Sequence, residues 1–256
     1  MTDEQLSKTL AELARVEQAM GDAEKDVEIY RIKKTQGLYD ARRAITSTIP
    51  NFWYIVLAEN DDFAEYVRPE DLKYLEHISD IYVHHDVADH GDATRYRDFS
   101  INVTFGTIPG SDSGSDSSPV PAQTVTKKFS VELVDGEDVL TSEPVDVAWP
   151  AELRDICPAT IRANKQRQYT LEEKKRYRQG MKSFFAWFEW TGRRLAKEFK
   201  AGNDLARLIS EDLHPNAVRY YVEAVNSDTA SDDSSEGDEL DVSDEDEQPA
   251  KRAHGE

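Results

Sequence analysis

The sequence contains one cysteine, limited apolar content and no long apolar run, and each shortage excludes a class of protein. The single cysteine, Cys157, rules out an intrachain disulfide and fits a reducing compartment. The longest apolar run, residues 52–58, is too short to span a bilayer. The first ten residues, MTDEQLSKTL, lack the basic and apolar regions of a secretory signal. We therefore expect a soluble intracellular protein without membrane contact, in which Cys157 is a small buried side chain.

Short motifs of catalysis and cofactor binding are missing as well. The sequence has no G-x-S-x-G and no H-E-x-x-H, and the glycines of PGSDSGSD are followed by neither a helix nor a lysine. Potential metal ligands cluster once, in VHHDVADHGD, at His84, His85, Asp86, Asp89 and His90. Their spacing matches no zinc motif of defined geometry, so we interpret them as a polar strand end. The sequence predicts no enzyme activity, no cofactor and no metal site.

Positive charge is scarce. Lys and Arg total 31 against 51 Asp and Glu, which gives a formal net charge of −20. Residues 227–256 contain twelve acidic and two basic residues, so they carry −10, and residues 1–226 carry the other −10. This balance argues against binding to nucleic acid or anionic lipid and favours a basic partner. Simple solubility remains the alternative explanation.

Residues 3 to about 45 are predicted to form one long helix. Its apolar residues recur every three or four positions, at the period of a coiled coil. They are Leu6, Leu10, Leu13, Val16, Met20, Ala23, Val27 and Tyr30. Such a helix is roughly 60 Å long, and a narrow stripe of that length needs a second helix to cover it. We predict a homodimer held by residues 1–45; the alternative is an amphipathic helix that lies on its own domain.

Residues 46–226 are predicted to form an α+β domain. Two short helices come first: one capped by Thr46 or Thr48 with Pro50 in its first turn, and one that begins near Pro69 with Leu72 and Leu75 facing inward. Period-two alternation then predicts antiparallel strands in ISDIYVHHDV, RYRDFSINVTF and VTKKFSVELV, and a shorter one in EPVDVAWP. Residues 107–124 are expected to be a flexible hairpin tip without core-forming residues.

Helical periodicity returns near Thr170, which forms a capping-box spacing with Glu173. The predicted helix includes KSFFAWFEW, with four rings on one broad apolar face and Trp190 at its edge; we expect them to form core rather than a stacking platform. A last helix, roughly 193–213, is expected to end before His214 and Pro215. The element order indicates helices against one face of an antiparallel meander.

Two charged segments have open interpretations. The basic stretch contains Lys165, Arg167, Lys174, Lys175, Arg176, Arg178 and Lys182. DNA phosphate, an acidic protein or a nuclear import receptor would suit it, but interleaved glutamates favour a solvated helix face. Residues 227–256 are predicted to be disordered. Their acidic residues include Asp232, Asp233, Glu236, Asp238, Glu239, Asp241, Asp244, Glu245, Asp246 and Glu247. This tail would act as a mobile counterion for a basic protein, or only as a solubilising segment; phosphorylation of Ser235 and Ser243 would add charge.

Five blocks of sequence resemble the nucleosome assembly protein family, and in particular its SET-like branch. They are IPNFWYIVLAEN, YLEHISDIYV, YRDFSINVTF, KSFFAWFEW and EDLHPNAVRYYV, in the family's order and across residues 1–225. The resemblance implies a nuclear, ATP-independent histone chaperone, with shuttling to the cytoplasm left open. It implies a dimer of "earmuff" domains whose acidic underside binds core histones, the tetramer-forming pair first and the other pair to varying degrees.

Carried over by position, Glu211 and Asp212 fall on that acidic underside, and Asp204 is a weaker candidate. The chain departs from the family in two places: Ser and Asp replace the aromatic hairpin tip at 110–118, and His214 replaces an aromatic residue. Some members bind a histone acetyltransferase or inhibit a phosphatase. The alternative function is therefore a regulatory or scaffold subunit of a chromatin-modifying enzyme. No sequence-specific binding of nucleic acid is expected.

Overall fold

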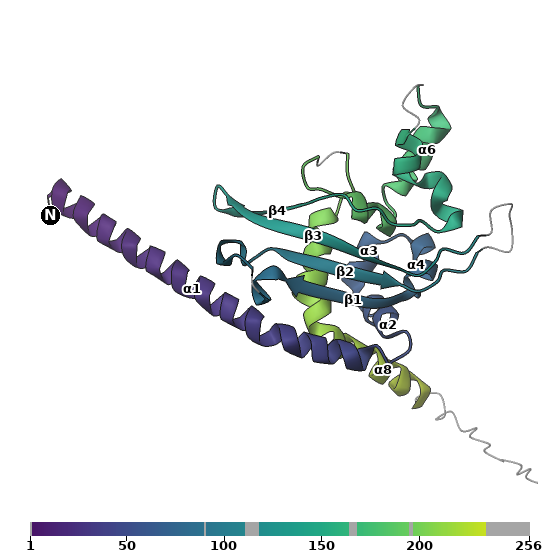
Figure 1. The fold of residues 1–256 in the computed structure, drawn as a ribbon, viewed down its shortest axis with the longest axis horizontal. Coiled ribbons are helices and arrows are strands. Elements are labelled where there is room, and N and C mark those ends of the chain that lie inside the picture. Colours follow the sequence, from purple (N-terminus) through teal and green to yellow (C-terminus); the bar gives the residue numbers. More distant parts are fainter. Residues whose placement is uncertain (1, 90, 111–117, 164–167, 195–196, 234–256) are drawn as a thin grey trace, which may run out of the picture.

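The computed structural model describes residues 2–89, 91–110, 118–163, 168–194 and 197–233, with side chains up to residue 227. Within these residues the chain is an α+β domain with a long helical arm, which confirms the predicted fold class (Figure 1). The helices are α1 (Asp3–Thr46), α2 (Phe52–Ala58), α3 (Asp61–Tyr66), α4 (Pro69–Leu75), α5 (Pro158–Ala163), α6 (Leu171–Gly180), α7 (Gly202–Arg207) and α8 (His214–Asp233). The strands are β1 (Ile78–His85), β2 (Phe99–Phe105), β3 (Gln123–Val134) and β4 (Glu137–Ser142).

The four strands form an antiparallel meander in the order β1-β2-β3-β4. Alternate residues face the core, so that Val83, Ile101 and Lys127 lie in one row across three strands. Figure 1 shows α2, α3, α4 and α8 together on one side of this sheet, as the element order predicted. On the opposite face, polar side chains pair across strands, for example Thr104 with Thr124 at 3.0 Å.

Strand β4 was not predicted, and the strand expected within 143–150 does not form. Asp135 and Gly136 both have positive φ, at 53° and 85°, which suits the tight turn that folds β4 back on β3. Residues 143–150 instead leave the sheet in an extended path. The expected hairpin tip at 107–124 is also shorter than predicted, because Ile108 and Val120 pair with each other and are buried.

Helix α1 begins with a capping box between Thr2 and Gln5 and runs without a break to Thr46. Residues 2–24 are all exposed, whereas the C-terminal part lies along the edge strand β1 (Figure 1). There Gln36 donates hydrogen bonds to the Tyr82 hydroxyl at 2.6 Å and to the Val83 carbonyl at 3.2 Å. The Arg43 guanidinium pairs with Asp80 at 2.5 Å. The helix thereby covers a strand edge that would otherwise expose unpaired backbone groups.

The predicted helix at 170–192 is two elements. α6 has the expected capping box between Thr170 and Glu173, but it ends at Gly180. A β-carbon at Gly180 would lie 1.8 Å from the Ile156 carbonyl oxygen, so this position admits no side chain. The aromatic segment that follows is a 3₁₀ helix, Phe184–Glu189, in which all residues but Glu189 are buried.

The 3₁₀ helix is fixed by Asp71 of α4, which is completely buried. Its carboxylate accepts hydrogen bonds from the Ser183 hydroxyl and the Phe184 N–H, both at 2.9 Å. A 3₁₀ helix repeats every three residues, so Phe184 and Trp187 lie on one ridge with Trp190 after them. Trp190 is accordingly buried rather than at the edge of the core. The core role of these rings is confirmed: Trp187 stacks on Phe129, and Phe185 on Phe105.

The last predicted helix is also different. α7 passes through a π-helical turn, Leu208–Leu213, directly into α8, so the chain stays helical through His214 and Pro215. Proline has no N–H and its ring clashes with the carbonyl of the residue four positions earlier. The wider π turn just before Pro215 relieves that conflict. α8 continues to Asp233, and the predicted domain boundary at 226 therefore lies inside a helix.

The start of the domain shows three smaller differences. α2 begins at Phe52 after Asn51, whose φ of 55° is left-handed, and neither Thr46 nor Thr48 caps it. α3, capped by Asn60, was not predicted. Pro69 opens α4 as expected, but only Leu75 of the two predicted leucines is buried, while Leu72 is exposed.

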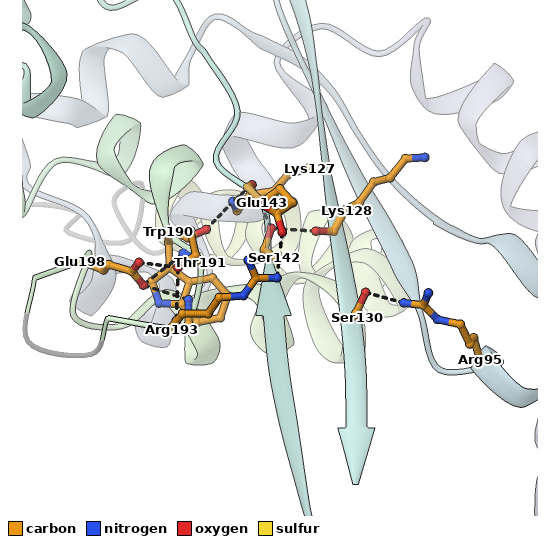
Figure 2. A network of polar contacts seen from close by, with 11 residues as sticks. Arg95, Lys127, Lys128, Ser130, Ser142, Glu143, Trp190, Thr191, Arg193 and Glu198 are labelled. Carbon is orange, nitrogen blue, oxygen red and sulfur yellow. Dashed lines mark hydrogen bonds and ion pairs between the residues drawn. The ribbon is translucent and has the colours of Figure 1, made fainter. Parts of the chain in front are cut away.

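A lysine side chain also lies inside the core. Lys127 on β3 has no exposed surface, and its ammonium donates hydrogen bonds to the carbonyl oxygens of Glu143, Phe188 and Trp190 (Figure 2). Nearby, the Glu198 carboxylate accepts hydrogen bonds from the backbone N–H groups of Thr191 and Gly192. These bonds tie the end of the aromatic segment to the sheet.

Candidate functional site

A cleft of about 440 Å³ opens where α1, the end of the sheet and the α7–α8 junction meet. Its apolar floor includes Ile32, Val83, Phe99 and Leu140. Charged side chains come from all three walls: Glu28 and Arg31 from α1, Arg97 and Asp138 from the turn before β2 and from β4, and Arg207 and Glu211 from the α7–α8 junction. The cleft therefore combines apolar surface with charges of both signs.

Each of the three cleft carboxylates already has an arginine partner. Glu28 pairs with Arg31 at 2.6 Å, Glu211 pairs with Arg207 at 2.9 Å, and Asp138 pairs with Arg97. The pairs are exposed enough for water and salt to weaken them, so each contributes little to stability. A basic ligand in the cleft would have to compete with these arginines for the same carboxylates. Glu28 and Asp138 were missed from the sequence, because nothing local indicates that α1 and the β3–β4 hairpin meet Glu211.

Glu211 and Asp212 are adjacent in sequence but have different environments. Glu211 is exposed at the rim of the cleft. Asp212 is half-buried, and its oxygens accept hydrogen bonds from the Asn216 amide at 2.7 Å and the Tyr220 hydroxyl at 2.6 Å. That hydrogen bond to the carboxylate, together with burial, raises the pKa of Tyr220. Asp212 thus holds the first turns of α8, and Glu211 is the more accessible of the two carboxylates.

Asp204 belongs to a second acidic surface. It is exposed in the first turn of α7, and Asp62 and Glu65 of α3 lie near it around the Tyr66 ring. Burial and then the negative charges of Asp204, Asp62 and Glu65 raise the pKa of the Tyr66 hydroxyl. The structure therefore joins Asp204 to acids from a distant segment, while Glu211 lies in the cleft.

His214 forms part of the cleft wall and lies in an aromatic environment. It is 3% exposed, stacks on Trp53 with ring centroids 6.3 Å apart, and lies 4.8 Å from the Tyr39 ring. Burial, with the nearby charges of Arg42, His85 and Arg43, lowers the pKa of His214 to about 3. The side chain is thus a neutral core residue at physiological pH, which suits a position where the family resemblance implies an aromatic ring.

The long arm presents an apolar stripe away from its own domain. The exposed fractions of its large apolar residues run from 42% to 68%. These residues are Leu6, Leu10, Leu13, Val16, Met20, Val27, Tyr30, Leu38 and Ile45. Ala23 is exposed on the arm as well. The face that packs on the domain is a different one and includes Ile32 and Gln36, so the domain leaves the stripe uncovered.

Several predicted features lie elsewhere or outside the described residues. Asp232 and Asp233 are in α8 without described side chains, and Glu236, Asp238, Glu239, Asp241, Asp244, Glu245, Asp246 and Glu247 follow the last described residue. His84 approaches Asp89 at 3.2 Å, and His90 is not described. Within the described residues no three His, Cys, Asp or Glu side chains are grouped to hold a metal ion. No helix there is long and apolar enough to cross a membrane.

Residues 5–224 match the model of one protein family, nucleosome assembly protein (NAP). This chain belongs to the nucleosome assembly protein family. The match spans the long arm, the sheet, the cleft and the part of α8 up to residue 224.

Relatives and solved structures agree with this family membership. The chain is 39% identical over 221 residues to vacuolar protein sorting-associated protein 75 of Saccharomyces cerevisiae, covering 85% of this chain and 79% of that protein. The crystal structure of the Vps75 histone chaperone superposes with a TM-score of 0.73 at 36% identity and covers 86% of this chain and 99% of the other. The crystal structure of Ccp1 gives a TM-score of 0.56 at 29% identity, covering 86% and 97% of the two chains. The similarity therefore extends over almost the whole of each solved chain.

Proposed function

We propose that this protein is a histone chaperone that binds core histones and promotes nucleosome assembly without ATP. One observation carries this proposal: 86% of the chain superposes on the structure of a histone chaperone, with a TM-score of 0.73. The net charge of −20 suits a strongly basic ligand. The nucleus is the expected compartment for such a protein.

The protein would act as a homodimer through α1. The exposed stripe runs along about 60 Å of helix. In a monomer this apolar surface would stay in contact with water. A second α1 is the partner whose pattern matches, since the apolar residues repeat at the coiled-coil period. Leu38 and Ile45 extend this proposed interface beyond the residues expected from the N-terminal repeat.

Two acidic surfaces and a tail would share the histone. Glu211, with Glu28 and Asp138, offers carboxylates inside the cleft, and Asp204 offers a second group beside Asp62 and Glu65. Histone lysines and arginines would displace Arg31, Arg97 and Arg207 from the cleft carboxylates. The acidic residues beyond Asp233 would add avidity and raise the capture rate. The tetramer-forming histone pair is the first expected ligand.

Release of the histone to DNA would follow from the higher charge density of DNA. A chaperone that covers the DNA-contacting surfaces of histones prevents histone–DNA aggregation, and DNA, with its denser charge, takes the histone over. Binding should weaken with salt because exposed ion pairs are screened. The affinity should fall with salt less steeply than that of the tail alone if the cleft supplies apolar contact.

Deletion of the tail tests this function. The full chain and a chain ending at Asp233, so that α8 stays intact, are compared for binding to purified core histones across a salt series. The shortened chain should still bind at moderate salt, with lower affinity and a shallower salt dependence. A shortened chain that binds no histone would reduce the protein to a scaffold with a polyanionic tail, the alternative indicated by its resemblance to partners of chromatin-modifying enzymes.

A further inference from the structure

Among the described residues, six basic side chains gather on and beside α6. We call this surface the α6 patch, and its members are Lys174, Lys175, Arg178, Lys182, Lys197 and Lys200. All six side chains are exposed, and among the described residues none of the six forms an ion pair. Arg176, which points elsewhere on the same helix, is by contrast paired with Glu172 at 2.7 Å.

The patch is hollowed rather than flat. Lys175, Arg178 and Lys182 line a depression of about 530 Å³ together with Lys197 and Lys200 from the segment before α7. The two groups are some fifteen residues apart in the sequence, between Lys182 and Lys197. The fold brings both to one hollow. Unpaired cations that converge in this way create a local field of opposite sign to that of the whole protein.

An apolar groove of about 610 Å³ adjoins this hollow and shares Tyr177 and Arg178 with it. Its lining includes Ile161, Tyr169 and Leu171, with Lys174 at the border. Leu171 is 85% exposed, more than any other large apolar residue described. A ligand that fits both hollows therefore carries negative charge next to aliphatic side chains.

We propose that the α6 patch and its groove bind the acidic C-terminal segment of this protein, residues 234–256. That segment carries nine acidic and two basic residues, and its aliphatic residues Leu240 and Val242 lie within the run DELDVSDEDE. Acid and aliphatic side chains alternate there as the two adjoining hollows require. Docking would pair the carboxylates with Lys174, Lys175 and Arg178 and place Leu240 or Val242 against Leu171.

The acidic C-terminal segment is long enough to reach from α8 to the α6 patch. Its 23 residues follow the last described residue of α8 and extend to at most about 75–80 Å. A domain of about 190 residues has a radius of gyration of about 16 Å. The tail of the same protomer, or of a second copy in a dimer, therefore spans the distance from α8 to α6.

DNA is the competing ligand for a basic surface, and the observations favour the tail. Contact with phosphate uses cations but gives no role to the exposed Leu171 and its apolar groove. A DNA duplex would also be repelled by a protein whose net charge is −20. Tail binding does not depend on the proposed histone binding, because both partners belong to this chain.

Zero-length carbodiimide cross-linking of the full chain tests the contact directly. The reagent joins carboxylates to amines that touch, and mass spectrometry of the peptides locates the joined residues. Cross-links should connect residues 236–247 to Lys174, Lys175 and Lys182. Lys33 and Lys128, which are also exposed but lie outside the patch, should react at least several-fold less. An even spread over all exposed lysines would show undirected charge attraction and overturn the proposal.

Tail mobility gives a second measurement that uses variants. A dye at Ser243→Cys, in a Cys157→Ala background, should show anisotropy that falls as salt rises. Lys174→Glu with Arg178→Glu should abolish the salt-dependent part, and Leu171→Ser should reduce it. The control Lys33→Glu with Lys128→Glu changes the net charge equally and should leave it unchanged. Equal anisotropy in patch and control variants overturns the proposal. So does a DNA duplex that binds only the intact patch while tail anisotropy stays the same.

Discussion

The ammonium nitrogen of Lys127 lies 2.7 Å from the backbone carbonyl oxygen of Trp190, inside the aromatic core. Two further carbonyls, of Glu143 and Phe188, lie at 3.0 Å, so all three ammonium protons have acceptors. The same ammonium is 5.6 Å from the centre of the Phe129 ring. A lysine here does what an apolar residue could not, since it satisfies three carbonyls where the chain leaves the sheet.

Replacement of Lys127 by methionine should destabilise the protein by about 2–4 kcal/mol, because buried carbonyls lose their donors. Burial lowers the pKa of Lys127 to about 7, whereas the unfolded chain has the ordinary value near 10.5. Unfolding therefore takes up a proton between pH 7 and 10.5, and stability from this residue rises with pH there, by up to about 1.4 kcal/mol per unit. Urea unfolding of both proteins from pH 6 to 9 checks this. A difference in stability that is constant across pH would show that the carbonyls keep the ammonium charged.

His214 should make the protein sensitive to acid. Its folded pKa of about 3 lies below the unfolded value of 6.5, so the unfolded chain binds more protons in that window. Stability should fall as pH falls below about 6.5, by about 2 kcal/mol at pH 5. His214→Phe keeps a ring between Trp53 and Tyr39 and removes the titration. Thermal unfolding at pH 7 and pH 5 should show a smaller loss for the variant; equal losses would contradict the assignment.

Local patterns in the sequence were enough for much of the fold. The repeat from Leu6 to Tyr30, the proline at the start of α4 and the box formed by Thr170 and Glu173 each act within one or two turns of a helix. Three parts were predicted wrongly, and the first two of them depend on residues that are distant in sequence. Asp71 sets the 3₁₀ geometry that follows Ser183, and Ile156 meets Gly180 where α6 ends. The π turn before Pro215 allows α7 and α8 to form one continuous rod.

The candidate site was less predictable than the fold. Position in the family motif pointed to Glu211 and Asp212 together, but only contacts in space separate them. Arg207 pairs with Glu211, and Tyr220 holds Asp212. The two partners lie four and eight residues away, and many other pairs at those spacings exist in a chain this rich in charge. Asp204 likewise acquires its acidic neighbours from α3, which was not expected to be a helix.

Disruption of the α1 stripe should give monomers. Leu13→Glu with Met20→Glu places two carboxylates in the proposed coiled-coil seam, where each would be buried without a partner. Sedimentation should fall from twice the 29.1 kDa chain mass to a single chain. The matched control, Ala11→Glu with Gln18→Glu, has the same spacing on the opposite side of α1 and should stay dimeric. An unchanged mass of the first variant would refute pairing through this stripe.

Substitutions at Glu211 and at Asp212 should have different effects, the first on histone binding and the second on the stability of the fold. Glu211→Gln combined with Asp204→Asn should weaken core-histone binding by about 3–10-fold, since each exposed ion pair contributes up to about 1 kcal/mol. Their folded stability should change little, because both side chains are exposed. Asp212→Asn should instead lower stability by about 1–2 kcal/mol through weaker bonds to Asn216 and Tyr220. Titration with histones and urea unfolding of each variant measure the two effects. The reverse pattern would assign the ligand role to Asp212.

Replacement by alanine should have opposite effects on stability at two glycines. At Gly21 in α1 an added β-carbon meets nothing within 4 Å, so Gly21→Ala should stabilise the arm by about 0.5–1 kcal/mol through helix propensity. At Gly180 the same atom would lie 1.8 Å from the Ile156 carbonyl oxygen, and the backbone there has to move. Gly180→Ala should therefore cost about 3 kcal/mol or more. Thermal unfolding of both variants compares one chemical change in two environments. A tolerated Gly180→Ala would mean that α6 and residues 151–156 do not pack as closely as described, and the end of α6 would then need another cause.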